Sequence, residues 1–225
     1  MRHFDEELDE LRSRLLEMSG LVEDAIYRSV QCLVDDDEAQ AQQVFRNEAR
    51  INQMEMEIDG LATRLLALQQ PLATDLRFIT AAIKINSDLE RMGDLAVNIV
   101  ERALWLLREP GPMPLIDIPD MARRAQAMVR RSLDAFVKRD VALAQGVLLS
   151  DDAVDELRDT LYEELIRFMQ ERPAQVRRGV NLMFIVRNLE RLADHATNVA
   201  EDVLYLVQGI DVRHHTLQEQ PKVEG

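Results

Sequence analysis

Cysteine, glycine, proline and aromatic residues are all scarce in this sequence. The single cysteine, Cys32, excludes a disulfide framework and a cysteine-clustered zinc site. Only 8 glycines and 7 prolines in 225 residues leave little material for turns, and aromatic residues make up 4%. Hydrophobic residues reach 47%, which is ample for a buried core, and we expect Cys32 to lie in it. This balance is typical of long helices and argues against a β-sheet.

The sequence also lacks segments that would direct a chain into or across a membrane. No apolar run approaches the roughly 18 to 20 residues that span a bilayer. The first ten residues, MRHFDEELDE, are acidic, whereas a signal peptide begins with a basic stretch followed by an apolar one. We therefore predict a cytoplasmic protein.

A basic excess is missing as well. The chain has 27 basic and 41 acidic side chains and a net charge of −14. Residues 1–112 hold 12 basic and 22 acidic side chains, and residues 113–225 hold 15 and 19. Neither half has the positive surplus that binding to a phosphate backbone requires, so we predict no nucleic-acid partner. Surplus carboxylates serve solubility, attract cationic partners or coordinate metal ions.

Apolar residues recur at three- and four-residue spacing along nearly the whole chain, which predicts an all-α protein. Asp35-Asp36-Asp37 is expected to end the first helix and cap the second. Pro71 and Pro173 break the pattern, and a proline-rich stretch lies midway. After it we predict helices from about 119 to 138, from 140 to 172, and from there to about 209. The predicted domains are a three-helix bundle (1–110), a linker (111–118), a second three-helix bundle (119–210) and a polar tail (211–225).

The two predicted bundles are copies of one unit. A shift of 100 lays residues 88–106 on residues 188–206, and nine of the nineteen positions are then identical. Earlier segments align at a shift of 103, as in Met18 with Met121 and Val44 with Val147. We therefore predict two tandem, duplicated bundles that differ by short insertions in their loops.

Each copy carries four oxygen-bearing side chains on one helix face. On an ideal helix with Glu90 set at zero, Asp94 falls near 40°, Asn98 near 80° and Glu101 near 20°. Carboxylates four residues apart repel, and a bound hard cation would offset that repulsion. A solvated acidic face is the alternative. The predicted metal ligands are Glu90, Asp94, Asn98 and Glu101 in the first copy, and Glu190, Asp194, Asn198 and Glu201 in the second.

The identity of the metal stays open, because an all-oxygen site accepts Mg²⁺, Mn²⁺, Ca²⁺ or iron. His195 follows Asp194 directly and therefore points about 100° away from the stripe, as a surface or packing histidine would. Arg77 opens the third helix, where it would fix a helix terminus or hold an anion. No catalytic constellation surrounds the serine, histidine or aspartate residues, so no catalytic residue is predicted.

The sequence resembles the PhoU family of bacterial phosphate-transport regulators over nearly its whole length. The resemblance rests on Gln70-Pro71 through Asp75-Leu-Arg77, on Leu89-Glu-Arg-Met-Gly-Asp94, and on residues 188–201, NLERLADHATNVAE. It implies a symmetric two-bundle helical fold with an E/D-x-x-x-D motif in each bundle, matched here by Glu90/Asp94 and Glu190/Asp194. In some members of the family these motifs hold metal ions.

The resemblance also implies a function. Such a protein is a non-enzymatic negative regulator of the phosphate starvation response. It couples the ATPase subunit of the phosphate ABC transporter to a sensor histidine kinase, restrains uptake, and reaches the membrane only through these partners. We also expect a homodimer. Two alternatives remain: a metal-dependent phosphohydrolase on a helical scaffold, and a purely structural scaffold.

Overall fold

The structure, a computed structural model, describes residues 2–69, 71–109, 111–114 and 116–209. Within these ranges the chain is helical and contains no β-strand, which confirms the all-α prediction. None of the described helices combines the length and the apolarity needed to cross a bilayer. The predicted polar tail, 211–225, lies outside the described residues.

The first bundle consists of three long helices, α1 (Arg2–Val34), α2 (Ala39–Gln69) and α3 (Ala73–Arg108). Asp37 accepts a hydrogen bond from the backbone N–H of Ala39 at 3.0 Å, so the aspartate run caps the second helix as expected. The long helices form because leucine, isoleucine, valine and methionine recur on the inner face of each, where they are buried.

The second bundle consists of α4 (Ile118–Lys138), α5 (Val141–Leu148), α6 (Asp151–Glu171) and α7 (Val176–Gln208), with a 3₁₀ turn, η1 (Pro173–Gln175), before α7. Asp117 and Asp140 cap α4 and α5 by accepting from backbone N–H groups. Gly209 ends α7 in the left-handed conformation, with φ 71°.

The expected continuous helix from 140 to 172 is wrong, because it is broken at Leu149 and Ser150. A backbone bond from Ser150 N to Val147 O, 2.9 Å long, closes a turn there. The Ser150 hydroxyl donates to the carbonyl of Gly146 at 2.7 Å and accepts from Arg131 of α4 at 3.3 Å. Asp151 and its neighbour then start α6, where carboxylates favour a helix N-terminus. The single helix expected over residues 140–172 is therefore two consecutive helices, α5 and α6.

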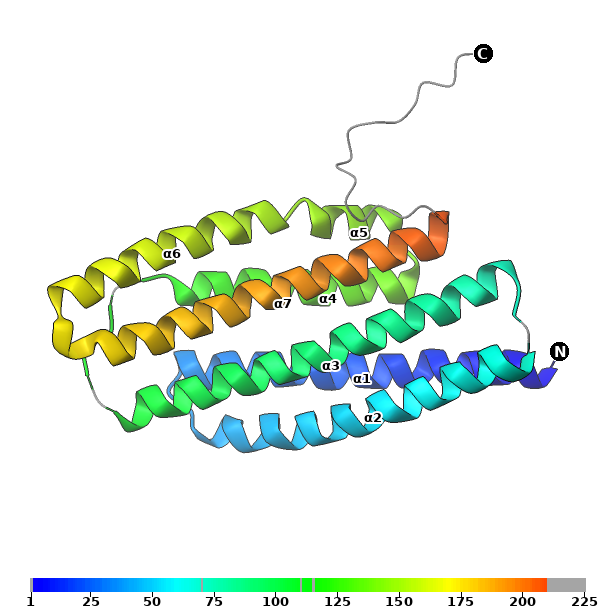
Figure 1. The fold of residues 1–225 in the computed structure, drawn as a ribbon, viewed down its shortest axis with the longest axis horizontal. Helices are drawn as coiled ribbons and strands as arrows, with labels where there is room; N and C mark the ends of the chain where they lie inside the picture. Colours follow the sequence, from blue (N-terminus) through cyan, green and yellow to red (C-terminus); the bar gives the residue numbers. More distant parts are fainter. Residues whose placement is uncertain (1, 70, 110, 115, 210–225) are drawn as a thin grey trace, which may run out of the picture.

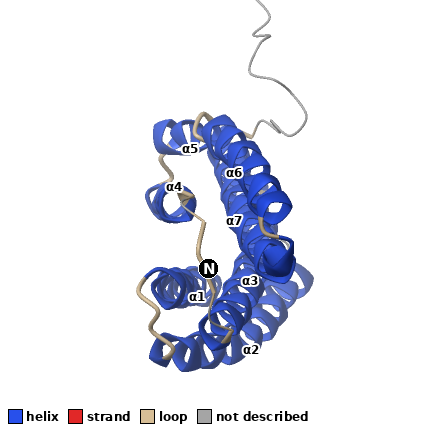
Figure 2. Ribbon diagram, turned by 90° about the vertical axis from the view of Figure 1, so that its left-hand side faces the viewer, coloured by secondary structure: helices blue, strands red, loops and turns tan. Residues whose placement is uncertain are grey.

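The two bundles lie side by side along their long axes, joined by α3 and α7 (Figure 1). Viewed along that axis, α1 and α4 lie on one side and the α3–α7 pair on the other (Figure 2). The buried apolar side chains of both bundles form one continuous cluster, because α3 packs against α7 and α1 also contacts α4. Cys32 is fully buried in this core, as expected.

Candidate functional site: two carboxylate clusters

Carboxylates gather where α2 packs against α3. Glu90 is half-buried and Asp94 is exposed on α3, opposite Glu48 and Glu55 of α2. Burial raises the pKa of Glu90, and the negative charges of Asp94, Glu55 and Glu48 raise it further, whereas Arg91 opposes them. We call Glu48, Glu55, Glu90 and Asp94 the first cluster.

Glu55 belongs to this cluster although sequence reasoning missed it. Its pKa is raised by burial and by the charges of Asp59 and Asp94. Glu55 and Asp59 form an E-x-x-x-D pair on α2, the same spacing that identified Glu90 and Asp94 on α3. That spacing was the available signal, but only the packing of the two helices shows that both pairs meet.

A second cluster lies in the corresponding place between α6 and α7. It consists of Asp151 and Asp155 of α6 with Glu190 and Asp194 of α7. Burial raises the pKa of Asp151 to about 6, and the charges of Asp155 and Asp194 contribute. The pKa of Asp194 is also raised, by burial first and then by Glu190 and Asp155. Asp151 and Asp155 show the same four-residue spacing and were likewise missed.

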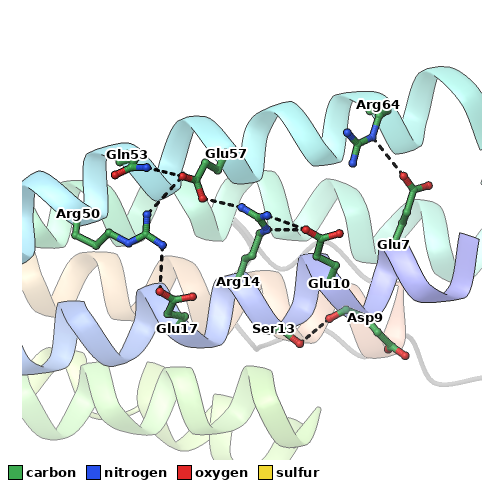
Figure 3. Close-up of polar contacts among 10 residues, drawn as sticks. All are labelled: Glu7, Asp9, Glu10, Ser13, Arg14, Glu17, Arg50, Gln53, Glu57 and Arg64. Atoms are coloured by element: carbon green, nitrogen blue, oxygen red, sulfur yellow. Dashed lines mark hydrogen bonds and ion pairs between the residues drawn. The ribbon is translucent and has the colours of Figure 1, made fainter. Parts of the chain in front are cut away.

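The opposite face of α2 shows how acidic side chains behave when they are ordinary surface groups. Between α1 and α2, Arg14 bridges Glu10 and Glu57, with Arg14–Glu57 at 2.6 Å (Figure 3). Arg50 contacts both Glu57 and Glu17 in the same view. Carboxylates on this face are paired with arginines, whereas Glu55 faces other carboxylates. The first cluster therefore differs from a solvated acidic face.

The other four predicted ligands lie apart from these clusters. Asn98 and Glu101 are exposed farther along α3, where the antiparallel α2 offers no carboxylate, because residues 39–47 contain none. Asn198 donates to Asp88 of α3 at 3.2 Å. Glu201 lines a cavity of about 310 Å³ between α3 and α7, together with Asp88. The structure thus brings together Glu90 with Asp94 and Glu190 with Asp194.

His195 lies in the packed α3–α7 seam, whereas Arg77 lies in the first turns of α3. The Nδ1 of His195 lies 2.8 Å from Asp88 in the α3–α7 seam, and both residues are 7% exposed. His195 is therefore a packing histidine, as expected. Arg77 reaches Thr74 of its own first turn at 3.5 Å, and its Nε is buried without a hydrogen-bond partner among the described residues.

The donor chemistry of the first cluster fits a hard cation, because it offers only oxygen and holds like charges together. In the described part of the chain, no three histidine, cysteine, aspartate or glutamate side chains converge as ready-made metal ligands. Binding an ion would therefore require Glu55, Glu90 and Asp94 to turn toward it. The second cluster fits less well, because Arg158 of α6 already binds two of its carboxylates, Asp155 and Glu190.

Comparison with known proteins identifies the family. The PhoU domain model matches twice, over residues 15–103 and 118–203. The chain belongs to the PhoU family. The two matches fall on the two bundles, as the duplicated sequence predicted.

Relatives match along almost the full chain. The Phosphate-specific transport system accessory protein PhoU homolog of Pseudomonas aeruginosa is 42% identical over 95% of this chain and 88% of its own length. The homolog of Aquifex aeolicus is 40% identical over 95% and 97%. The crystal structure of PhoU from Pseudomonas aeruginosa superposes with a TM-score of 0.89, at 42% identity, over 92% of this chain and 100% of that one.

A crystal structure of the phosphate transport system regulatory protein PhoU from Streptococcus pneumoniae gives a TM-score of 0.85. It is 30% identical and covers 93% of this chain and 99% of that one. Both solved structures confirm the helical fold.

Proposed function

We propose that this chain is a regulatory accessory protein of phosphate-specific transport and acts without catalysing a reaction. The observation that carries the proposal is its similarity along nearly the whole chain to proteins named for that role, such as one that is 42% identical over 214 residues. In this role the chain is an adaptor that couples the ATPase subunit of the phosphate ABC transporter to the sensor histidine kinase of the phosphate regulon. It acts as a cytoplasmic homodimer and restrains uptake when phosphate is plentiful.

The surroundings of His195 support the non-enzymatic part of the proposal. Helical metal-dependent phosphohydrolases supply histidines beside their carboxylates. Among the residues that the structure describes, His195 directs its Nδ1 to Asp88, 2.8 Å away, and Asp88 belongs to neither carboxylate cluster. The absence of phosphatase turnover with Mg²⁺ or Mn²⁺ is the expected result, and turnover abolished by Asp94→Ala would contradict it.

Deletion of the gene tests the regulatory role. In phosphate-rich medium, the deletion strain should take up labelled phosphate faster than its parent, and the wild-type gene should restore the slower rate. Crosslinking in cells, followed by purification of this chain, should recover the transporter ATPase subunit and the sensor kinase. Unchanged uptake together with neither partner recovered would contradict the proposal.

Metal binding at the carboxylate clusters is the second part of the proposed function. When bound, a divalent cation or iron would neutralise carboxylates that otherwise repel one another across two helices. Glu55, Glu90 and Asp94 would hold it in the first cluster. Ligand binding stabilises the folded state by roughly 2.7 kcal/mol at one hundred times the dissociation constant of a single site. Thermal melts with chelator and with excess Mn²⁺ should therefore differ, and Asp94→Ala should reduce the difference.

A further inference from the structure

The second cluster contains a cation of its own. The guanidinium of Arg158, on α6, lies 2.8 Å from both Glu190 and Asp155 through Nη1, and 2.9 Å from Asp159 through Nε. The Arg158 side chain is 23% exposed and that of Glu190 is 18% exposed, so this ion pair is partly shielded from water. Charge-assisted bonds in such a setting are stronger than exposed ones.

The duplication shows what stands at the same place in the first cluster. The shift of 103 that aligns Val44 with Val147 carries Glu55 onto Arg158 and Glu48 onto Asp151. The structure agrees with this alignment, because the same shift carries the buried Ile51 and Ile58 of α2 onto the buried Val154 and Leu161 of α6. Arg158 binds Glu190, which is the counterpart of Glu90. At one equivalent position, therefore, the first cluster has a negative charge and the second a positive one.

We propose that Arg158 takes the place of a bound cation in the second cluster, so that divalent cations bind preferentially to the first cluster. An ion approaching Glu190 or Asp155 must break their bonds to Arg158 and is repelled by its charge. Where the first cluster has Glu55, the second has Arg158, so the local charge differs by two units. This difference should make the affinity of the second cluster for a divalent cation at least about tenfold lower. Asp151 and Asp194 are not bound by Arg158, so some affinity remains. This inference rests on the metal-binding part of the proposed function.

A reciprocal exchange of the two residues tests the inference on the full chain. Binding of Mn²⁺ is followed by the electron paramagnetic resonance signal of the free ion, which disappears when the ion is bound. Glu90→Gln with Asp94→Asn should remove the tight binding, and Asp151→Asn with Asp194→Asn should remove only the weaker binding. Arg158→Glu should tighten the weaker binding by about tenfold or more, and Glu55→Arg should weaken the tight binding by a similar factor.

Arg167→Glu is the matched control, because Arg167 is exposed on α6 and the substitution changes the charge by the same amount. It should leave both binding constants within about twofold of wild type, since exposed charges are screened. Circular dichroism of each variant checks folding. If Arg158→Glu does not fold, the Mn²⁺ affinities of Arg158→Gln and Glu55→Arg test the inference instead. Arg158→Gln should tighten the weaker binding, and Glu55→Arg should weaken the tight binding.

The experiment distinguishes failure of the role of Arg158 from failure of metal binding itself. Equal affinities of the two clusters, unchanged by Arg158→Glu and by Glu55→Arg, would overturn the role of Arg158 and leave metal binding in place. The absence of Mn²⁺ binding in the wild type and every variant would overturn both.

Discussion

The thiol of Cys32 is protected twice over. It is fully buried on α1, and burial raises its pKa to about 11, with the nearby charges of Asp37, Glu38 and Asp36 contributing. Because the thiolate is the reactive form, iodoacetamide at about pH 8 should modify Cys32 far more slowly in the folded protein than in urea. Mass spectrometry of timed samples checks this, and equal rates in the two conditions would contradict it.

Glu23 lies in a groove of about 530 Å³ between α1 and α4. Its pKa is raised mainly by burial, although Arg130 lowers it and Asp134 raises it further. The folded protein therefore takes up this proton before the unfolded chain does as the pH falls. The unfavourable contribution is present at neutral pH and is relieved as the pH drops through the folded-state value.

Replacing this carboxylate should accordingly stabilise the protein only at higher pH. Glu23→Gln should raise the free energy of unfolding by about 0.5 kcal/mol near pH 7, a value reduced for solvent screening, and by almost nothing near pH 4. Urea unfolding at the two pH values measures the difference. Glu163→Gln, at an exposed position of α6, is the control. A gain that is equally large at both pH values would contradict the assigned cause.

At the scale of the helices, a buried carboxylate of α3 makes polar contacts with α7. Asp88 of α3 is 7% exposed, lies 2.8 Å from His195 Nδ1 and accepts from Asn198 at 3.2 Å, both on α7. Asp88→Ala leaves these two groups without their acceptor and should lower the free energy of unfolding by about 2 kcal/mol. Asp88→Asn keeps one acceptor oxygen and should cost less. Denaturant unfolding in chelator measures both, and equal losses would argue against a hydrogen-bonding role.

Helix positions were largely predictable from the sequence, because prolines and caps act locally. Pro71, Pro173 and the capping Asp37 predicted breaks that the structure contains. The break at Leu149 and Ser150 was not predictable in this way, because Arg131 of another helix contributes to it. Local periodicity does not contain such a contact.

Half of the carboxylate clusters was predictable for the same reason. Glu90 and Asp94 share a face of one helix, and the helical repeat alone shows this. Their meeting with Glu55, and the pairing of Glu190 with Arg158, depend on the register between helices. That register is determined by packing of the core, so a single-helix pattern does not reveal it.

Across the whole molecule, the duplicated halves meet at a seam whose two ends differ. Lys84 of α3 binds Asp202 of α7 at 2.9 Å. Under the shift of 100, Lys84 corresponds to Phe184 and Asp202 corresponds to Arg102. The Arg102 guanidinium lies 4.9 Å from the centre of the Phe184 ring. Equivalent positions are therefore in contact at both ends of the seam, through an ion pair at one end and a cation–π contact at the other. The two carboxylate clusters likewise differ in charge at an equivalent position. The duplication of the sequence therefore does not make the two halves chemically equivalent.

Arg178 ties the halves together at the connection between them. It is 5% exposed on α7, and its guanidinium donates to the carbonyls of Leu106 at 3.1 Å and Glu109 at 2.8 Å, at the end of α3. A Cβ at Gly111 would come within 3.1 Å of Arg178 Nε, so the connecting chain passes close against this side chain. These bonds satisfy carbonyls that a helix end otherwise leaves unpaired.

Removal of the guanidinium should therefore loosen the connection before it unfolds either bundle. Arg178→Met should lower the free energy of unfolding by about 2 kcal/mol, because bonds from a charged donor to buried carbonyls are lost. Limited thermolysin digestion should then cut the variant between residues 109 and 117 much faster than the wild type. Arg187→Met, at an exposed position of the same helix, should behave as wild type. Equal cleavage of Arg178→Met and wild type would show that Arg178 does not hold the connection in place.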